Sequence, residues 1–254
     1  MARTAVEAFS DSANAYAATM APALRPVAAE VVRRAGLVPG SAVLDVGTGT
    51  GIGAAAALGE GRRVVGLDGA PGMLALARRD VPEATFVEAD FMALPFEDGS
   101  FDAVIAVHAL LFAPDQVGAL AEWRRVTKVG GRLSLSVPGP WEATSAPIFE
   151  PIQRSFGISG GRRYPDAAAL RESADAAGWT EIENDADPSV AITLASDDDF
   201  DRWMATGSRG QLTGDWTPER QRALRDAMLR ATPRDAAGQL QIPFGALFVS
   251  ARNG

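Results

Sequence analysis

The sequence predicts an α/β protein built on an open, doubly wound and mostly parallel sheet. Between residues 39 and 140, short apolar runs alternate with stretches of helical pattern. Runs that are apolar throughout are typical of parallel strands covered on both faces, and right-handed crossovers between them give a doubly wound sheet. The 254 residues suit one large domain with a sizeable core.

The predicted core contains five strands, with a helix between most successive pairs. The expected strands are AVLDV (42–46), RVVGLD (63–68), ATFVEAD (84–90), FDAVIAVH (101–108) and GRLSLSVPG (131–139). Helices are expected from about 52, over 71–79 and over 115–126. In such a sheet, ligands bind beyond the carboxyl ends of the strands.

The flanking segments are predicted to add helices and the last strands. Residues 4–35 have a helical pattern, in which we expect breaks at Pro22 and Pro26. The remaining elements are an irregular connection (141–165), a helix (166–177), a strand (179–186), a helical insert (197–232) and a final strand (245–252). We therefore divide the domain into a helical cap (1–38), a core (39–140), a substrate wall or lid with core elements (141–243) and the final strand (244–254).

Composition excludes several classes of protein. The net charge of −8 disfavours binding to nucleic acid or to anionic membranes. The chain has no cysteine, so disulfides, thiolate catalysis and zinc–thiolate sites are excluded. Its N-terminus lacks the apolar core of a signal peptide, and its longest apolar stretch, 103–113, is too short to cross a bilayer. We expect a cytoplasmic protein.

A glycine-rich loop follows the first predicted strand in the sequence VLDVGTGTGIGA. Gly47, Gly49 and Gly51 allow the backbone to turn sharply and to approach a ligand closely. The start of the next helix offers free N–H groups that favour an anion. Counted from Gly49, the loop also fits the G-x-G-x-x-A variant of the dinucleotide motif, so the loop alone leaves two ligand classes open.

Asp45 favours a ligand other than a dinucleotide. It lies two residues before Gly47, where a carboxylate would repel a pyrophosphate but attract the ammonium group of an amino-acid-like ligand. The alternative is that Asp45 only caps a turn at the strand end.

Acidic residues also end the next two predicted strands. Asp68 lies 21 residues after Gly47, where a carboxylate can accept both hydroxyls of a ribose. Asp90 is followed by Phe91 and Met92, and an acid beside an aromatic ring suits an adenine. One aspartate at a strand end is often a cap, but three in succession, the first with a glycine loop, favour a binding site.

Together these segments resemble class I S-adenosylmethionine-dependent methyltransferases, especially the type 11 or ubiquinone/menaquinone-biosynthesis-like group that acts on small molecules. The resemblance is strong over about 40–140 and weaker at both ends. It is carried by VLDVGTGTG, VVGLDGAPGMLALAR, FVEADFMALPFEDGSFDAVIAVHALLFAPD and ALAEWRRVTKVGGRLSLSV. It implies a Rossmann-like seven-stranded sheet of order 3-2-1-4-5-7-6, with strand 7 antiparallel.

The resemblance also implies an activity and a set of site residues. The enzyme would use S-adenosyl-L-methionine, release S-adenosyl-L-homocysteine, and methylate an O, C or N atom of a small aromatic or natural-product-like molecule. The implied cofactor-binding residues are Asp45, Gly47, Thr48 and Gly49 (methionine part), Asp68, Gly69 and Met73 (ribose side), Asp90 and Phe91 (adenine), and Val107 (near the sulfonium).

His108, the sole histidine, lies just past the fourth strand and is a candidate general base. The alternative is that it only lines the pocket, because positioning and exclusion of water can supply most of the acceleration of methyl transfer. Tyr16 and Trp141 are candidate substrate contacts, and we expect no metal site. Family members that methylate nitrogen in nucleic acids or proteins often carry a Pro- and aromatic-rich motif where this chain has VHALLFAPD, which favours a small-molecule substrate.

Two other functions stay open. A nicotinamide-dependent oxidoreductase would need a Tyr-x-x-x-Lys pair, whereas Tyr16 and Tyr164 are followed four residues later by Met20 and Ala168. A non-methylating cyclase, rearrangement enzyme or regulatory partner would keep the same cofactor pocket. Either a monomer or a homodimer is compatible with the sequence.

Overall fold

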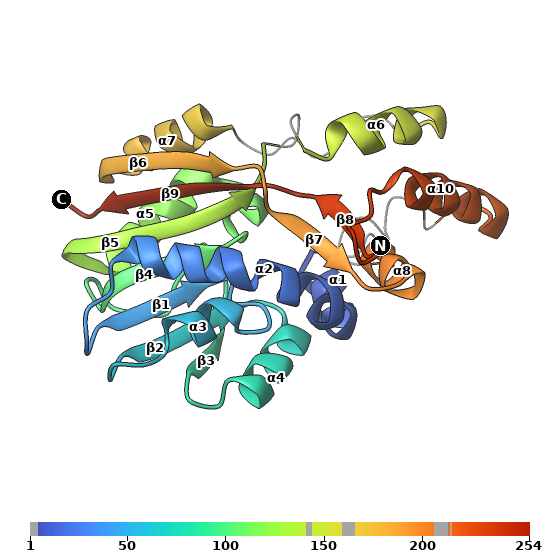
Figure 1. Cartoon of the computed structure of the whole chain (residues 1–254). Helices are drawn as coiled ribbons and strands as arrows, with labels where there is room; N and C mark the ends of the chain where they lie inside the picture. The colour runs from blue at the N-terminus through green and yellow to red at the C-terminus, as the bar shows by residue number, and fades with distance from the viewer. Residues whose placement is uncertain (1–4, 141–143, 159–165, 206–212, 214) are drawn as a thin grey trace.

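A seven-stranded sheet forms the centre of the molecule, with helices on both of its faces (Figure 1). The computed structural model describes residues 5–140, 144–158, 166–205, 213 and 215–254. The strands lie in the order β3-β2-β1-β4-β5-β9-β6, and β9 runs antiparallel to both of its neighbours. The predicted fold class and strand order are therefore confirmed.

The strands of this sheet differ from the predicted runs mainly at their ends. They are β1 (Ala42–Val46), β2 (Arg63–Asp68), β3 (Thr85–Glu88), β4 (Phe101–Val107), β5 (Thr127–Pro138), β6 (Thr180–Asp187) and β9 (Ala246–Arg252). The helices between them are α3 (Ile52–Ala57), α4 (Pro71–Asp80), α5 (Gln116–Val126) and α7 (Ala167–Ala176), with a short 3₁₀ helix, η1 (Leu110–Phe112). β5 begins earlier than predicted because Thr127 already pairs with Phe101.

The apolar side chains of the central strands point alternately to the two faces. Leu44 and Val104 belong to the core under α5 and α7, whereas Val43 and Ile105 belong to the core under α2 and α3. In Figure 1, α2 and α3 lie in front of the sheet and α5 and α7 behind it. Both faces are covered, which is why these strands are apolar throughout.

The N-terminal segment forms α1 (Ala5–Asp11) and α2 (Ala13–Ala35). The predicted breaks at Pro22 and Pro26 are wrong, because both prolines lie inside a continuous α2 and the interruption falls at Ser12. A proline inside a helix costs about 3 kcal/mol. Packing of α2 against α3, β4 and β5 offsets this cost, with one buried stripe of Leu24, Val27, Ala28 and Val31.

The C-terminal half contains more regular structure than predicted. The connection predicted to be irregular contains α6 (Ala146–Ser155), which is held in place by the buried ring of Phe149. Two short strands, β7 (Ala191–Leu194) and β8 (Leu240–Pro243), pair as a separate antiparallel sheet that the sequence analysis did not predict. The described helices of the predicted insert are α8 (Asp197–Ala205) and α10 (Pro218–Ala231).

The parallel strands all point toward the end of the molecule where α1, β7 and β8 lie (Figure 1).

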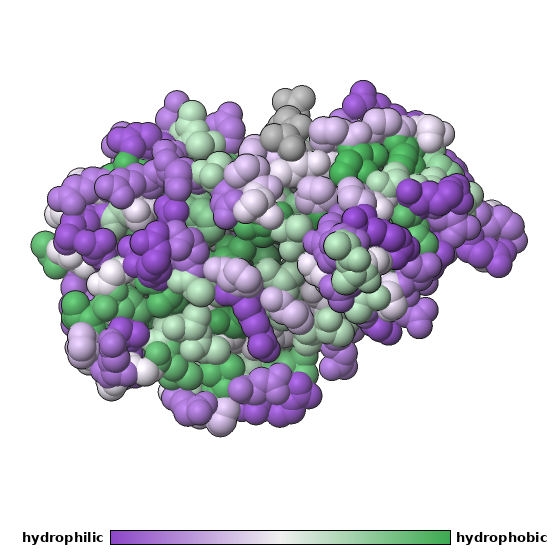
Figure 2. All heavy atoms as spheres, in the orientation of Figure 1, coloured by the Kyte–Doolittle hydropathy of each residue, from purple (hydrophilic) through white to green (hydrophobic). Residues whose placement is uncertain are grey.

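Figure 2 shows hydrophilic side chains gathered at the far right of this view, where α10 lies. None of the helices within the described ranges is long and apolar enough to cross a membrane.

Candidate functional site

A cavity of about 660 Å³ opens at the carboxyl ends of β1, β2 and β4. Pockets for small molecules typically enclose about 300–1,000 Å³. Most of the predicted site residues line this cavity, namely Tyr16, Gly47, Gly49, Asp68, Gly69, Met73, Asp90, Phe91, Val107 and His108. Asp45 and Thr48 are not among its lining residues, and Trp141 lies outside the described residues.

The glycine loop is closed against the segment that follows β4. Gly47 has φ +66°, and a Cβ at this position would lie 2.4 Å from the Cβ of Ala109. Only glycine allows both this backbone conformation and this approach. Gly47 and Gly49 also line the cavity, so the loop places its backbone on the cavity wall.

Asp68 connects the glycine loop to the start of α4. One carboxylate oxygen accepts the backbone N–H of Gly49 and the other that of Ala70, both at 2.8 Å. Burial raises the pKa of Asp68, and the backbone N–H groups oppose this rise. A carboxylate has about four lone-pair sites, so each oxygen of Asp68 can still accept a ligand hydroxyl.

Asp45 lies behind the loop instead of on the cavity wall. Its side chain is buried, and one oxygen accepts a 2.6 Å hydrogen bond from the Thr48 hydroxyl, which is also buried. A Cβ on Gly53 would lie 2.6 Å from the other oxygen, so α3 packs tightly over the carboxylate. The structure thus brings Asp45 and Thr48 to each other and not to the cavity, because Gly53 of α3 lies directly against the carboxylate.

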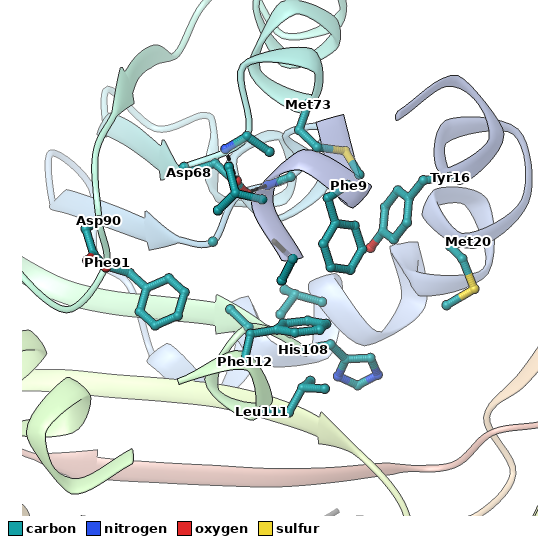
Figure 3. Close-up of a pocket in the computed structure, with 18 of the residues that line it drawn as sticks. Phe9, Tyr16, Met20, Asp68, Met73, Asp90, Phe91, His108, Leu111 and Phe112 are labelled. Atoms are coloured by element: carbon teal, nitrogen blue, oxygen red, sulfur yellow. Dashed lines mark hydrogen bonds between the residues drawn. The ribbon is translucent and has the colours of Figure 1, made fainter. Parts of the chain in front are cut away.

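Asp90 and Phe91 follow β3, on the same side of the cavity as Asp68 (Figure 3). The exposed carboxylate of Asp90 accepts the backbone N–H of Met92 at 2.8 Å. Trp123 holds Phe91 in place, because its indole N–H donates to the Phe91 carbonyl at 3.0 Å and its ring meets the Phe91 ring edge-on. The Phe91 ring is thereby fixed at the cavity edge.

The opposite side of the cavity is apolar and comes largely from α1 and α2. Figure 3 shows Phe9, Tyr16 and Met20 on this side, with Phe112 between them and Phe91. The Phe9 ring meets the rings of Tyr16 and Phe112 edge-on, with centroid distances of 6.2 and 5.0 Å. The sequence analysis missed Phe9 and Met20. Met20 lies four residues after Tyr16 and therefore on the same face of α2, which was the available signal, whereas Phe9 belongs to the separate helix α1 and carries no such signal.

His108 forms the floor of the cavity and is itself buried. Its ring Nδ1 lies 3.0 Å from the Ser136 hydroxyl, and its Nε2 has no hydrogen-bond partner within the described part of the chain. Burial lowers the pKa of His108 to about 4, although a contact with the Ser136 backbone opposes this change. The ring is therefore neutral at pH 7.

The charges around the cavity are of one sign. Its described lining includes the carboxylates of Asp68, Glu88 and Asp90 and no lysine or arginine. Such a wall favours a cationic ligand over an anionic one. Within the described residues, no group of three or more acidic or histidine side chains is placed to hold a metal ion.

Comparison with known proteins identifies related chains. Residues 44–135 match the family model described as "Methyltransferase domain". A demethylmenaquinone methyltransferase of Renibacterium salmoninarum is 40% identical over 126 residues, which are 50% of this chain and 51% of that enzyme. The demethylmenaquinone methyltransferase of Mycobacterium sp. (strain KMS) is 32% identical over 166 residues, covering 58% of this chain and 71% of the relative. The matched stretch thus spans about half the length of the first of these relatives.

The fold is also shared with solved structures. The crystal structure of a candidate methyltransferase from Bacillus halodurans superimposes with a TM-score of 0.60 at 20% identity, covering 89% of this chain and 98% of that one. This likeness concerns the fold.

Proposed function

The chain belongs to the methyltransferase domain family that includes the demethylmenaquinone methyltransferases, and from this premise we propose that it transfers the methyl group of S-adenosyl-L-methionine to a small molecule. One observation carries the proposal. Asp68, Asp90 and the glycine loop converge on one cavity whose described lining holds no lysine or arginine. A nucleoside that carries a positively charged sulfonium group fits a cavity that combines acidic side chains with the exposed backbone of a glycine loop.

The residues on the acidic side fit the parts of such a cofactor. We propose that Asp68 accepts the ribose hydroxyls, with Gly69 and Met73 beside it, since its oxygens keep acceptor capacity after their backbone contacts. Asp90 would accept from the adenine amine, while Phe91 packs against the ring. Gly47 and Gly49 would face the methionine part, and Val107 the methyl group that the cofactor supplies.

Asp45 and Thr48 contribute to this site indirectly in our proposal. Their mutual hydrogen bond lies under the loop, so they would hold the backbone of Gly47 and Gly49 in place without touching the ligand. This role replaces the direct contact between Asp45 and an ammonium group that the sequence suggested.

The acceptor molecule would occupy the apolar side of the cavity. Phe9, Tyr16 and Phe112 offer aromatic rings for a planar and uncharged group. Close packing there would exclude water and hold the acceptor in line with the methyl group, which is the main requirement of this displacement. None of the described residues between 144 and 243 lines the cavity, so a substrate wall in this range stays a prediction, as does any contact with Trp141. A cytoplasmic location and a monomeric or homodimeric state also stay predictions.

Calorimetry with S-adenosylmethionine, S-adenosylhomocysteine and NAD tests the cofactor. We expect binding of the first two and none of NAD, and tight NAD binding without a response to the other two would refute the proposal. Cofactor with an isotopically labelled methyl group, incubated with phenolic, quinone and polyketide-like acceptors, then tests the reaction. Conversion of an acceptor without label transfer would indicate the non-methylating cyclase instead.

A further inference from the structure

His108 and Ser136 are joined twice across neighbouring strands. The backbone N–H of His108 donates to the Ser136 carbonyl at 3.0 Å, and the ring Nδ1 lies 3.0 Å from the Ser136 hydroxyl. His108 has φ +55°, a left-handed conformation that is uncommon for residues other than glycine. Such conformations are retained where the surroundings determine them, often at functional sites. The ring is therefore held in one orientation toward the cavity.

The hydrogen bond between the two side chains can run in either direction. If Nδ1–H donated to the hydroxyl oxygen, the hydroxyl hydrogen of Ser136 would have no acceptor among the described residues. Ser136 is fully buried, so bulk solvent does not supply one. If the hydroxyl donates to Nδ1, the hydroxyl hydrogen has its acceptor, and only lone pairs of the Ser136 oxygen are left without a donor. Buried groups tolerate an unused lone pair better than an unsatisfied hydrogen. The second arrangement leaves the ring proton on Nε2.

We propose that Ser136 is a positioning residue that holds His108 in its Nε2–H form, so that His108 presents a hydrogen-bond donor to the cavity and not a base. His108 lines the cavity, and its buried Nε2 has no partner in the described structure, so a donor at this atom would be satisfied by a bound molecule that packs against the ring. A ligand oxygen that accepts a hydrogen bond fits it. The proposal about the two residues stands independently of methyl transfer, whereas the use of the donor by an acceptor substrate rests on the proposed function.

The carbonyl of Ser136 is the competing partner of Nδ1. It lies close enough to oppose the lowering of the His108 pKa, and it would favour a proton on Nδ1. However, this carbonyl already accepts the backbone N–H of His108, whereas the hydroxyl has Nδ1 as its one hydrogen-bond partner in the described chain. We therefore expect the hydroxyl to decide which nitrogen carries the proton.

The chain contains one histidine, so its ring can be observed without ambiguity. In ¹⁵N-labelled protein at pH 7, without cofactor or substrate, two-bond ¹H–¹⁵N correlations identify the protonated ring nitrogen. We expect the Nε2–H form to exceed the other by about tenfold, the preference that avoids one buried unsatisfied hydroxyl. A ring protonated mainly on Nδ1 would overturn the proposal. Because no ligand is present, this result is independent of whether the protein methylates anything.

Variants of β5 test whether Ser136 is responsible. In Ser136→Ala we expect the preference for Nε2–H to fall at least about threefold, since the donor to Nδ1 is gone. Ser136→Thr keeps a hydroxyl and should restore the preference. Ser134→Ala is the matched control, because Ser134 is equally buried on the same strand but donates to the Val31 carbonyl at 2.7 Å. An unchanged tautomer in a folded Ser136→Ala would show that Ser136 does not position the ring, and wild-type spectra decide the tautomer even if Ser136→Thr does not fold.

Discussion

The hydroxyl of Thr48 donates a 2.6 Å hydrogen bond to the buried carboxylate of Asp45. This bond lies beneath the glycine loop, so a residue that looks like a ligand contact in the sequence is enclosed by protein instead. Burial raises the pKa of Asp45 to about 7, and the Thr48 hydrogen bond opposes this rise. The protonation state of this carboxyl group should therefore affect stability near neutral pH.

We predict that Asp45→Asn changes how stability depends on pH. The ordinary pKa of 3.8 applies to the unfolded chain, so between pH 3.8 and about 7 the native state holds a proton that the unfolded state has lost. Stability from this group is then present at low pH and is lost as the pH rises through that window. The asparagine has no proton to lose. Between pH 5 and pH 8, the wild-type protein should lose about 2–3 kcal/mol of unfolding free energy that Asp45→Asn does not lose, because each pKa unit corresponds to about 1.4 kcal/mol. The stability of the variant relative to wild type should therefore rise by that amount over this pH range.

Urea unfolding at both pH values measures this difference. Glu97→Gln is a suitable control, since it removes an exposed carboxylate and surface substitutions usually change stability little. If Asp45→Asn followed wild type at both values, the carboxyl group would titrate alike in the folded and unfolded chains.

We predict that Asp68→Ala weakens binding of S-adenosylmethionine more than Asp90→Ala does. Asp68 would lose two ligand hydrogen bonds, each worth about 1.5–3 kcal/mol with some compensation by water. It would also release the N–H groups of Gly49 and Ala70. Asp90 is exposed and would lose one ligand contact. We expect the dissociation constant to rise about 10²-fold or more for Asp68→Ala and about tenfold for Asp90→Ala. Calorimetric values that are equal or reversed would contradict this assignment.

We predict that Gly72→Ala weakens the cofactor although Gly72 does not line the cavity. Ser10 in α1 packs on the start of α4, where a Cβ on Gly72 would lie 2.3 Å from the Ser10 carbonyl oxygen. The methyl group would push α1 away, and α1 carries the cavity residues Val6 and Phe9. Stopped-flow release of S-adenosylhomocysteine should become about tenfold faster, which corresponds to about 1.4 kcal/mol.

Ser10→Ala separates displacement of α1 from loss of a hydrogen bond. The Ser10 hydroxyl accepts the N–H of Gly72 at 2.9 Å, and its removal leaves room for α1 to stay in place. We expect release to accelerate only about two- to threefold in this variant, in line with about 0.5 kcal/mol. Equal effects of the two substitutions would mean that the close approach at Gly72 is unimportant.

The sequence predicted those parts of the site that depend on strand ends. Gly47, Asp68 and Asp90 lie at or just after the carboxyl ends of parallel strands, so their meeting at one edge follows from the fold. It did not predict which way a side chain at a strand end points. Asp45 lies one residue before the end of β1 and Asp68 is the last residue of β2, yet the tight approach of α3 encloses the first and leaves the second at the cavity.

The α2 helix shows a second limit. Pro22 and Pro26 oppose a helix locally, and only packing on the sheet, which is non-local, keeps α2 continuous. The same applies to β7 and β8, which are four residues each and lie far apart in the chain, so neither carries a strong pattern of its own. Phe9 reaches the cavity because the chain breaks at Ser12 and α1 turns onto α4.

The last prediction is that His108 does not act as a general base. Loss of a base lowers turnover by about 10²–10⁴-fold, whereas loss of one hydrogen-bond donor and some packing costs about three- to tenfold. We expect the smaller loss in His108→Ala, and a partial recovery in His108→Asn, because asparagine tolerates the left-handed backbone and keeps a side-chain N–H.

The dependence of turnover on pH is an independent test of the same prediction. Because burial lowers the pKa of His108 to about 4, its neutral form persists well below 6.5, and any acidic limb of kcat near pH 6.5 should survive in His108→Ala. A loss of 10³-fold or more with unchanged cofactor affinity, together with the disappearance of an acidic limb, would establish His108 as the base.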